Sequence, residues 1–353
     1  MKTDVTRWRI GLAAGLVGAL AAVVLGFLTF GVQSTVAPRG LPLALAVPAG
    51  PAGAGLAPVT DRVVAQSGGA VEWRVVDPAR AAELLDDAEV YGVLELAPGV
   101  DGAVTITTRT SGAVHPAGTL AAEQVLAGAG GALAEVVAQR TGTSPAAVEE
   151  TVHPATPAAR SLPLSATALL WIGALAANAV LLLTARRAGR GYPVPGALTG
   201  AATIAVVGPA VVYGFAGLWG LGIGWSWGVW AFLALVAGGF ALLQAGLLRL
   251  VGLPGIGLLG MLYLSAPAVA GQVPELLHPA YRVLLWSWTP IRFSTEALRS
   301  LFFSGGVAPA VTVGAWVFAG LAVAGLAVLL APSRRRPADT PEPAGTPSPA
   351  AVG

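Results

Sequence analysis

The chain has 353 residues, no cysteine, charged side chains at only 11% of its positions and a mean hydropathy of +0.73. These values exclude an ordinary soluble domain and are typical of proteins that fold in a lipid bilayer. The lack of cysteine also excludes disulfides, thiolate nucleophiles and cysteine-bound zinc or iron–sulfur sites.

The sequence is basic, with a pI near 9.3 and a formal net charge of +2. Its basic residues lie mainly beside apolar stretches, where they orient membrane helices, so we expect no nucleic-acid partner. Lys2 is the only lysine. A GxxxxGK[ST] loop needs a lysine within the fold to reach nucleotide phosphates, so we expect no ATP hydrolysis through such a loop.

The apolar stretches predict the fold class. A helix needs about 20 residues to cross roughly 30 Å of hydrocarbon. Six stretches reach that length: residues 8–31, 163–185, 196–219, 226–248, 251–271 and 309–331. The first is separated from the others by a mostly polar segment. This order predicts a polytopic α-helical membrane protein of about six transmembrane helices, with a small extracytoplasmic α/β domain inserted between helices 1 and 2.

Basic clusters predict the orientation. They comprise Lys2, Arg7 and Arg9; Arg186, Arg187 and Arg190; Arg249; and Arg334, Arg335 and Arg336. With an even number of spans, all of these clusters fall on one side of the membrane. The positive-inside rule then places both termini in the cytoplasm of a bacterial cell and residues 38–160 outside.

The first span is read as a retained anchor. Its apolar run of about 21 residues exceeds the roughly 7–15 residues of a signal-peptide core. Thr35-Val36-Ala37 has some similarity to a cleavage site, so cleavage is the alternative. The expected organisation is a cytoplasmic stub and helix 1 (1–37), the α/β domain (38–160), a five-helix membrane region (161–331) and a disordered cytoplasmic tail (332–353).

The insert reads as alternating strands and helices. Residues 41–47, 71–76, 90–97 and 104–108 have strand patterns, and residues 78–89 and 116–140 have helical ones. This order predicts a partly parallel sheet covered by helices. The apolar face of helix 116–140 packs either on its own sheet or on a partner.

We expect no enzyme activity, cofactor or metal site. His115, His153 and His278 lack the close spacing to other ligands that metal sites have, and they read as solvated loop residues. The chain also shows no GxSxG elbow and no spaced Ser, His and acid set.

The predicted spans contain no titratable group between their ends, although proton-coupled transporters need such groups. Asn178 and Gln244 are the main polar side chains, and we expect each to hydrogen-bond a neighbouring helix. Glycines recur at helix-packing spacing in Gly11/Gly15, Gly196/Gly200 and Gly220/Gly224. If the helices transport a substrate, the energy comes from another subunit.

The loop 272–306 contains an amphipathic helix. After Thr289-Pro290, one face carries Arg292, Glu296 and Arg299 at i, i+4 and i+7. The other face carries Ile291, Leu298, Leu301 and Phe302. This pattern predicts a helix at the outer interface, with Trp286, Trp288 and Phe293 at headgroup depth. A lining for an exit path is the alternative.

Several short motifs resemble a known family. Gly252-Leu253-Pro254-Gly255, Leu264-Ser265-Ala266-Pro267, Gly271-Gln272-Val273-Pro274, Trp288-Thr289-Pro290 and Ala297-Leu298-Arg299 resemble the end of ABC-2 type transporter permeases. The single anchor, LPLALAV and the segment from Val90 to Pro98 are similar to the YhgE/Pip branch. The chain departs from that branch at Val47-Pro48-Ala49-Gly50, and it lacks the long helical insertion of larger members.

The resemblance implies a membrane permease subunit that forms a homodimer, or a heterodimer with a similar permease, and works with a separate cytoplasmic ABC ATPase. The loop with Arg186, Arg187, Arg190 and Tyr192 would be the nearest surface for that ATPase. A purely topogenic role for these arginines is the alternative. The other function left open is a non-transporting envelope protein that acts as a surface receptor or secretion scaffold.

Overall fold

The computed structural model describes residues 2–98, 104–304 and 309–332. It is a polytopic helical membrane protein: seven helices in these ranges are long and apolar enough to cross a membrane. Six of them match the predicted spans: α1 (Lys2–Ser34), α6 (Pro157–Arg187), α7 (Val194–Leu218), α8 (Trp227–Val251), α9 (Leu253–Ala270) and α12 (Pro309–Leu330). The seventh, α5 (Pro116–Thr141), packs on a sheet. The tail predicted to be disordered lies almost entirely outside the described residues.

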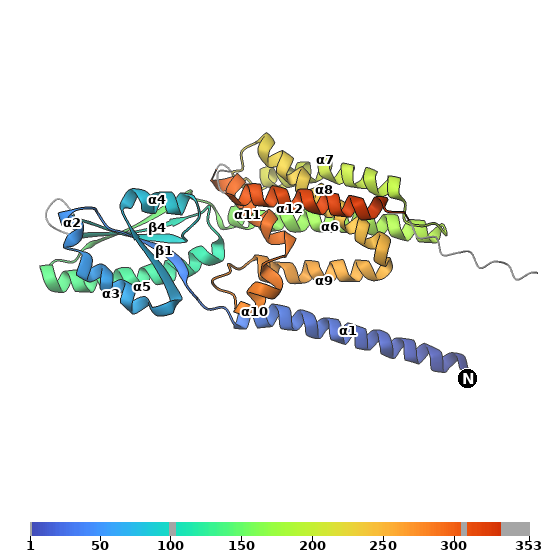
Figure 1. The fold of residues 1–353 in the computed structure, drawn as a ribbon, viewed down its shortest axis with the longest axis horizontal. Coiled ribbons are helices and arrows are strands. Elements are labelled where there is room, and N and C mark those ends of the chain that lie inside the picture. The colour runs from blue at the N-terminus through green and yellow to red at the C-terminus, as the bar shows by residue number, and fades with distance from the viewer. Residues whose placement is uncertain (1, 99–103, 305–308, 333–353) are drawn as a thin grey trace, which may run out of the picture.

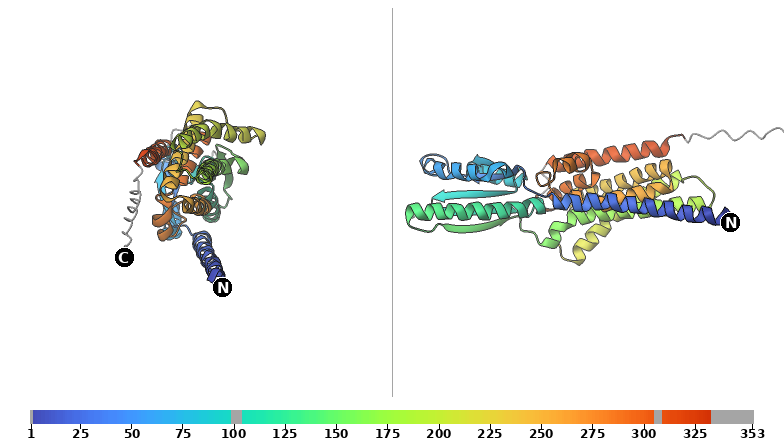
Figure 2. Two further views of the ribbon diagram at one scale, coloured as in Figure 1. Left: turned by 90° about the vertical axis from the view of Figure 1, so that its right-hand side faces the viewer. Right: turned by 90° about the horizontal axis from the view of Figure 1, so that it is seen from below.

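The molecule is elongated, with the α/β unit at one end and the long helices side by side at the other (Figure 1). Figure 2 shows that the start of α1 and the end of α12 lie far from the sheet. Arg186 and Arg187 in the last turn of α6, and Arg249 in the last turn of α8, lie at this distant end. Arg249 donates hydrogen bonds to the carbonyls of Val328 (3.4 Å) and Ala331 (2.6 Å), so it also caps α12.

Helix α8 is the centre of the bundle because α6, α7 and α12 all pack on it. Phe240 meets Trp171 of α6 and Phe318 of α12 edge to face, with ring centroids 4.8 and 4.9 Å apart. Asn178 of α6 donates to the Ala241 carbonyl (3.0 Å), and Gln244 of α8 donates to the Trp171 carbonyl (3.1 Å). The predicted interhelical role of both amides is confirmed.

Glycines bring α8 and α12 together. A Cβ at Gly246 would lie 2.9 Å from the Gly325 carbonyl oxygen, and a Cβ at Gly325 would strike the backbone of Leu242. The expected glycine pairs contribute less: a Cβ at Gly196 or Gly200 would meet Leu181 at 3.3 or 3.6 Å, and Gly220 and Gly224 lie in a loop. Gly15 faces open space.

The α/β unit contains five strands in the order β2-β1-β3-β4-β5. They are β1 (Leu41–Ala46), β2 (Val71–Val76), β3 (Gly92–Pro98), β4 (Val104–Ser111) and β5 (Ala146–Val152). β1 runs parallel to β2 and β3, β3 and β4 are antiparallel, and β4 and β5 are parallel. The sheet is therefore partly parallel, as predicted.

Helices cover both faces of the sheet. Leu43 and Leu45 of β1 pack under α5 and α3 (Ala57–Ser67), whereas Ala44 and Ala46 pack under α4 (Pro78–Asp86). β1 is apolar throughout because it is buried on both faces. Leu126 and Leu133 of α5 are 1% and 2% exposed against this sheet, which settles the role of the α5 face in favour of its own domain.

Four elements of this unit were not predicted: α2, α3, η1 and β5. α2 (Pro51–Ala54) and the 3₁₀ turn η1 (Gly68–Ala70) flank α3, which buries only Val59, Thr60 and Val63. β5 is an edge strand whose residues are almost all exposed, so its sequence AAVEETV lacks an apolar face.

A compact segment follows α9 and connects the two halves. It contains α10 (Pro279–Tyr281), a π-helical turn (Arg282–Trp286) and α11 (Pro290–Phe303). Tyr281 donates a hydrogen bond to the Phe27 carbonyl of α1 (3.1 Å) and packs with Val32. Most apolar side chains of α1 are exposed, including Leu20 (65%) and Phe30 (74%), as expected of a helix surrounded by lipid.

The close approach of α8 and α12 predicts a sharp effect of one methyl group. We expect Gly325→Ala to destabilise the bundle by about 1–3 kcal/mol, because the new Cβ meets the rigid backbone of Leu242. Gly320→Ala, on the same helix with no atom within 4 Å of the new Cβ, is the control. Thermal unfolding in detergent measures both, and equal melting temperatures would contradict this packing.

Candidate functional site

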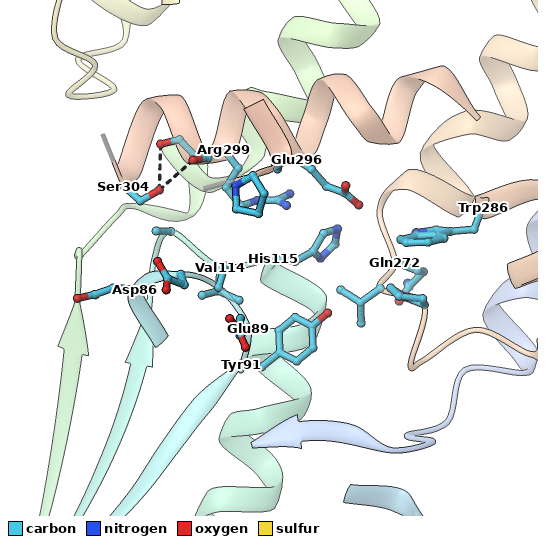
Figure 3. A pocket seen from close by; sticks show the side chains of 18 residues that line it. Asp86, Glu89, Tyr91, Val114, His115, Gln272, Trp286, Glu296, Arg299 and Ser304 are labelled. Carbon is cyan, nitrogen blue, oxygen red and sulfur yellow. Dashed lines mark hydrogen bonds between the residues drawn. The ribbon is translucent and has the colours of Figure 1, made fainter. Parts of the chain in front are cut away.

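A cavity of about 340 Å³ lies where the α/β unit meets the helices. Among the described residues, five segments line it: the end of α4 with its connection to β3, the residues just before α5, the segment from α9 to Trp286, α11 with Ser304, and the start of α12. Figure 3 shows Arg299 and Glu296 pointing from α11 towards His115, with Tyr91 on the opposite side. The cavity therefore brings together polar side chains from distant parts of the chain.

Helix α11 forms where it was predicted, but neither of its faces is free. Ile291 and Leu298, at 2% and 0% exposure, belong to the core of the bundle. Ser294 shares a hydrogen bond of 2.8 Å with Thr167 of α6. On the polar face, Glu296 and Arg299 look across the cavity towards Tyr91 and His115 of the α/β unit, so α11 lies at the junction and not as an anchor on the surface. The amphipathic sequence of α11 shows that its two faces lie in different surroundings. It does not show which parts of the protein, lipid or water surround each face.

Arg292 is held by aromatic rings on the polar face of α11. Its guanidinium carbon lies 3.8 Å from the ring centre of Trp286 and 3.7 Å from that of Phe293. It also pairs with Glu296 at 3.4 Å, the pairing expected at i, i+4. Trp286 and Phe293 thus form a cation–π clamp, whereas Trp288 is 53% exposed.

Arg299 is the most isolated charge of the cavity. Its side chain is 7% exposed, and Nε has no hydrogen-bond partner. Burial lowers the pKa of Arg299 to about 10, against the opposing effect of Glu296, and the group stays charged at neutral pH. Burial likewise raises the pKa of Glu296, which Arg292 and Arg299 partly offset.

His115 is not the solvated residue expected from the sequence. Nδ1 accepts a hydrogen bond from the Ala117 amide (3.2 Å), so His115 caps α5. The proton then resides on Nε2, which donates to the Ala270 carbonyl (3.2 Å). Burial, with Arg299 nearby, lowers the pKa of His115 to about 3, so the ring is neutral at physiological pH. A histidine in an apparent loop can be a helix cap when proline follows it, as here.

The other two histidines are exposed, as predicted. His153 lies 3.3 Å from Asp86, and His278 caps α10. No group of three histidine or acidic side chains within residues 2–98, 104–304 and 309–332 could hold a metal ion.

The loop after α9 fastens the α/β unit to the bundle. Tyr91, just before β3, donates a hydrogen bond to Glu275 Oε2 (2.9 Å), and burial raises the pKa of its hydroxyl. The Arg39 amide donates to the Glu275 carbonyl (2.9 Å), and the Ala37 amide donates to that of Leu276 (3.2 Å). Hydrogen bonds therefore join the two parts of the protein that form the cavity, the loop after α9 and the α/β unit.

The rim of the cavity is acidic. Asp86, Asp87 and Glu89 are exposed on the connection between α4 and β3. Asp86 contacts His153, and Glu89 pairs with Arg74 at 2.8 Å. Asp87 caps the end of α4 through its backbone amide, which leaves its carboxylate at the rim.

The four residues grouped as an ATPase-contact surface separate in the structure. Arg186, Arg187 and Arg190 are exposed at the end opposite the cavity. Tyr192 turns inward and donates a hydrogen bond to Asn178 Oδ1 (2.7 Å), and burial raises its pKa to about 12. Tyr192 is therefore part of the bundle, and the exposed surface consists of the arginines.

The charged and polar groups of the cavity differ in how far they are already engaged. A buried cation is aimed into it, whereas its histidine is already engaged by a backbone amide and a carbonyl. No protein-family model, curated protein or solved structure matches the chain. The resemblance to ABC-2 permeases therefore stays a prediction.

The neutral His115 predicts a pH dependence. In the unfolded chain its pKa is about 6.5, and in the fold it is about 3. The unfolded state therefore binds the proton first, and stability falls as pH drops from about 6.5 towards 3, by at most about 1.4 kcal/mol per pH unit. His115→Asn keeps a capping oxygen but cannot titrate there.

We expect the wild-type melting temperature to fall more than that of His115→Asn between about pH 7.5 and about pH 5. Glu296 titrates in the opposite sense in both proteins, so its effect cancels in the comparison. Parallel pH profiles would show that His115 is protonated in the fold.

Proposed function

We propose that the chain is the membrane permease subunit of an ABC-2-like exporter in a bacterial cell membrane, driven by a separate cytoplasmic ATPase. The observation that carries the proposal is the difference between the two ends of the molecule. Exposed arginines gather at one end of the bundle and the α/β unit lies at the other. The positive-inside rule then makes the arginine end cytoplasmic and the α/β unit extracytoplasmic.

The interior of the bundle favours an external energy source. Its buried polar amides, Asn178 and Gln244, are both engaged by neighbouring helices. No Asp, Glu, Lys, Arg or His side chain is buried within the described spans. A proton relay needs such groups, so a motor in trans fits better than proton coupling. The exposed apolar face of α1 also leaves room for a second permease copy, in a homodimer or heterodimer.

One observation favours the second candidate, a surface receptor or secretion scaffold. Four cavities lined by described residues lie in the α/β unit or at its junction with the helices. A receptor would use these surfaces without a path through the bundle. Deleting residues 38–160 would then abolish function, whereas changing Arg186 and Arg187 would not.

The proposed orientation is testable because the chain has no cysteine. Gln66 on α3 and Ala188 after α6 are both exposed, and they lie at opposite ends of the molecule. We expect a membrane-impermeant maleimide to label Gln66→Cys in intact cells, and Ala188→Cys only after the membrane is permeabilised. Labelling of Ala188→Cys in intact cells would invert the orientation.

The motor is testable by purification from the native host in mild detergent. We expect an ATPase to copurify, and the double variant Arg187→Glu, Arg190→Glu to reduce its recovery by at least about tenfold, since like-charge contacts cost several kcal/mol. Arg186 is left unchanged because it packs against Gly252. Arg62→Glu, an equally exposed charge reversal on α3, is the control. Recovering no ATPase with the wild type would favour the receptor or scaffold.

A further inference from the structure

We propose that the cavity at the junction binds a small zwitterion, an anionic phosphodiester joined to a primary ammonium group, as in an ethanolamine phospholipid headgroup. The inference relies on the proposed function only for the side of the membrane on which the junction lies. The binding itself requires neither an ATPase nor transport.

The first argument is the unpartnered charge of Arg299. Among the residues that the structure describes, its guanidinium has no hydrogen-bond or ion-pair partner, although the side chain is only 7% exposed. A buried charge without a partner is strongly unfavourable, and guanidinium groups bind phosphate oxygens through paired N–H donors. Arg299 points into the cavity (Figure 3), so an anionic group there would supply the missing acceptors.

The second argument is the acceptors that surround this cation. The amide oxygen of Gln272 lines the cavity and has no partner, although it is buried. On the rim, Asp86 and Glu89 already contact His153 and Arg74, which leaves the carboxylate of Asp87 to repel a ligand that is only anionic. A ligand that places an anion at Arg299 and N–H donors at these acceptors satisfies both sets. A primary ammonium donates three hydrogen bonds, whereas a quaternary ammonium donates none.

The third argument is depth. The cavity is bounded by Pro309 and Ala310, the first residues of the membrane-spanning helix α12. Exposed Trp219 directly follows α7 and exposed Trp227 begins α8, and these helix ends lie at the same end of the bundle. Tryptophans of this kind mark the membrane–water boundary. A headgroup of the outer leaflet would therefore lie at the level of the cavity. A soluble glycerophosphoethanolamine has the same chemistry and is the other source.

The test uses the full chain purified in detergent and native mass spectrometry with equimolar phosphatidylethanolamine, phosphatidylcholine and phosphatidylglycerol. We expect preferential retention of phosphatidylethanolamine and a loss of affinity of about tenfold or more in Arg299→Gln. Arg292→Gln removes a neighbouring arginine that is held outside the cavity by Trp286 and Phe293, and it should retain the preference.

Asp87→Asn keeps the proposal testable if Arg299→Gln fails to fold, because Asp87 is exposed on the rim. We expect this variant to melt like the wild type and to discriminate less between the ethanolamine and choline lipids.

A parallel titration with glycerophosphoethanolamine identifies the source. Binding of this compound without lipid retention assigns a free solute, and retention of the lipid assigns the bilayer. Binding of neither, or equal retention of all three lipids, would overturn the inference. Because no ATPase is present, this result is independent of the copurification experiment.

Discussion

The structure depends on the burial of α11, a helix whose apolar face is in the bundle core and whose charged side chains are largely withdrawn from water. Its apolar side packs into the bundle core through Ile291 and Leu298, and its polar side faces the α/β unit. A buried charge is stable only when paired or hydrogen-bonded, since desolvation costs several kcal/mol per ion. Arg292 meets this demand with two aromatic rings and Glu296. Arg299 has no such partner among the described residues, and its side chain lines the cavity.

The segment around the loop after α9 forms hydrogen bonds with three other parts of the molecule: α5, the residue before β3, and α1. The carbonyl of Ala270 accepts from His115 at the start of α5, and Glu275 accepts from Tyr91 next to β3. Tyr281 reaches the backbone of α1. The segment from Ala270 to Tyr281 therefore contacts the start of α5, the residue before β3 and helix α1.

The sequence predicts those features that depend on long apolar runs. Six spans follow from hydropathy, and β1 follows from a run that is apolar on both faces because both faces are buried. The interhelical roles of Asn178 and Gln244 follow as well, because a polar group in lipid must find a partner within the protein. Such features need no knowledge of which elements are neighbours.

The site itself was only partly predictable, because its residues acquire their roles from tertiary neighbours. The pattern of α11 identified Arg292, Glu296 and Arg299 but not the α/β unit that faces them. His115 was read as solvated because the Ala270 carbonyl lies 155 residues away. β5 and α3 bury too few side chains for their sequences to show the regular spacing of apolar residues that predicts a strand or a helix. The packing glycines of α8 and α12 cannot be distinguished by spacing alone in a chain with 47 glycines.

The uneven packing of the helices indicates where the molecule can move. In the most apolar part of α8, 61% of the residues are buried, compared with 6% in that of α1. Around α8, backbone contacts through Gly246 and Gly325 and the cluster of Trp171, Phe240 and Phe318 leave little freedom to slide. Helix α1 is attached mainly near its C-terminal end, through Tyr281 and the loop after α9. The cavity therefore lies between this tightly packed core and the loop that holds α1.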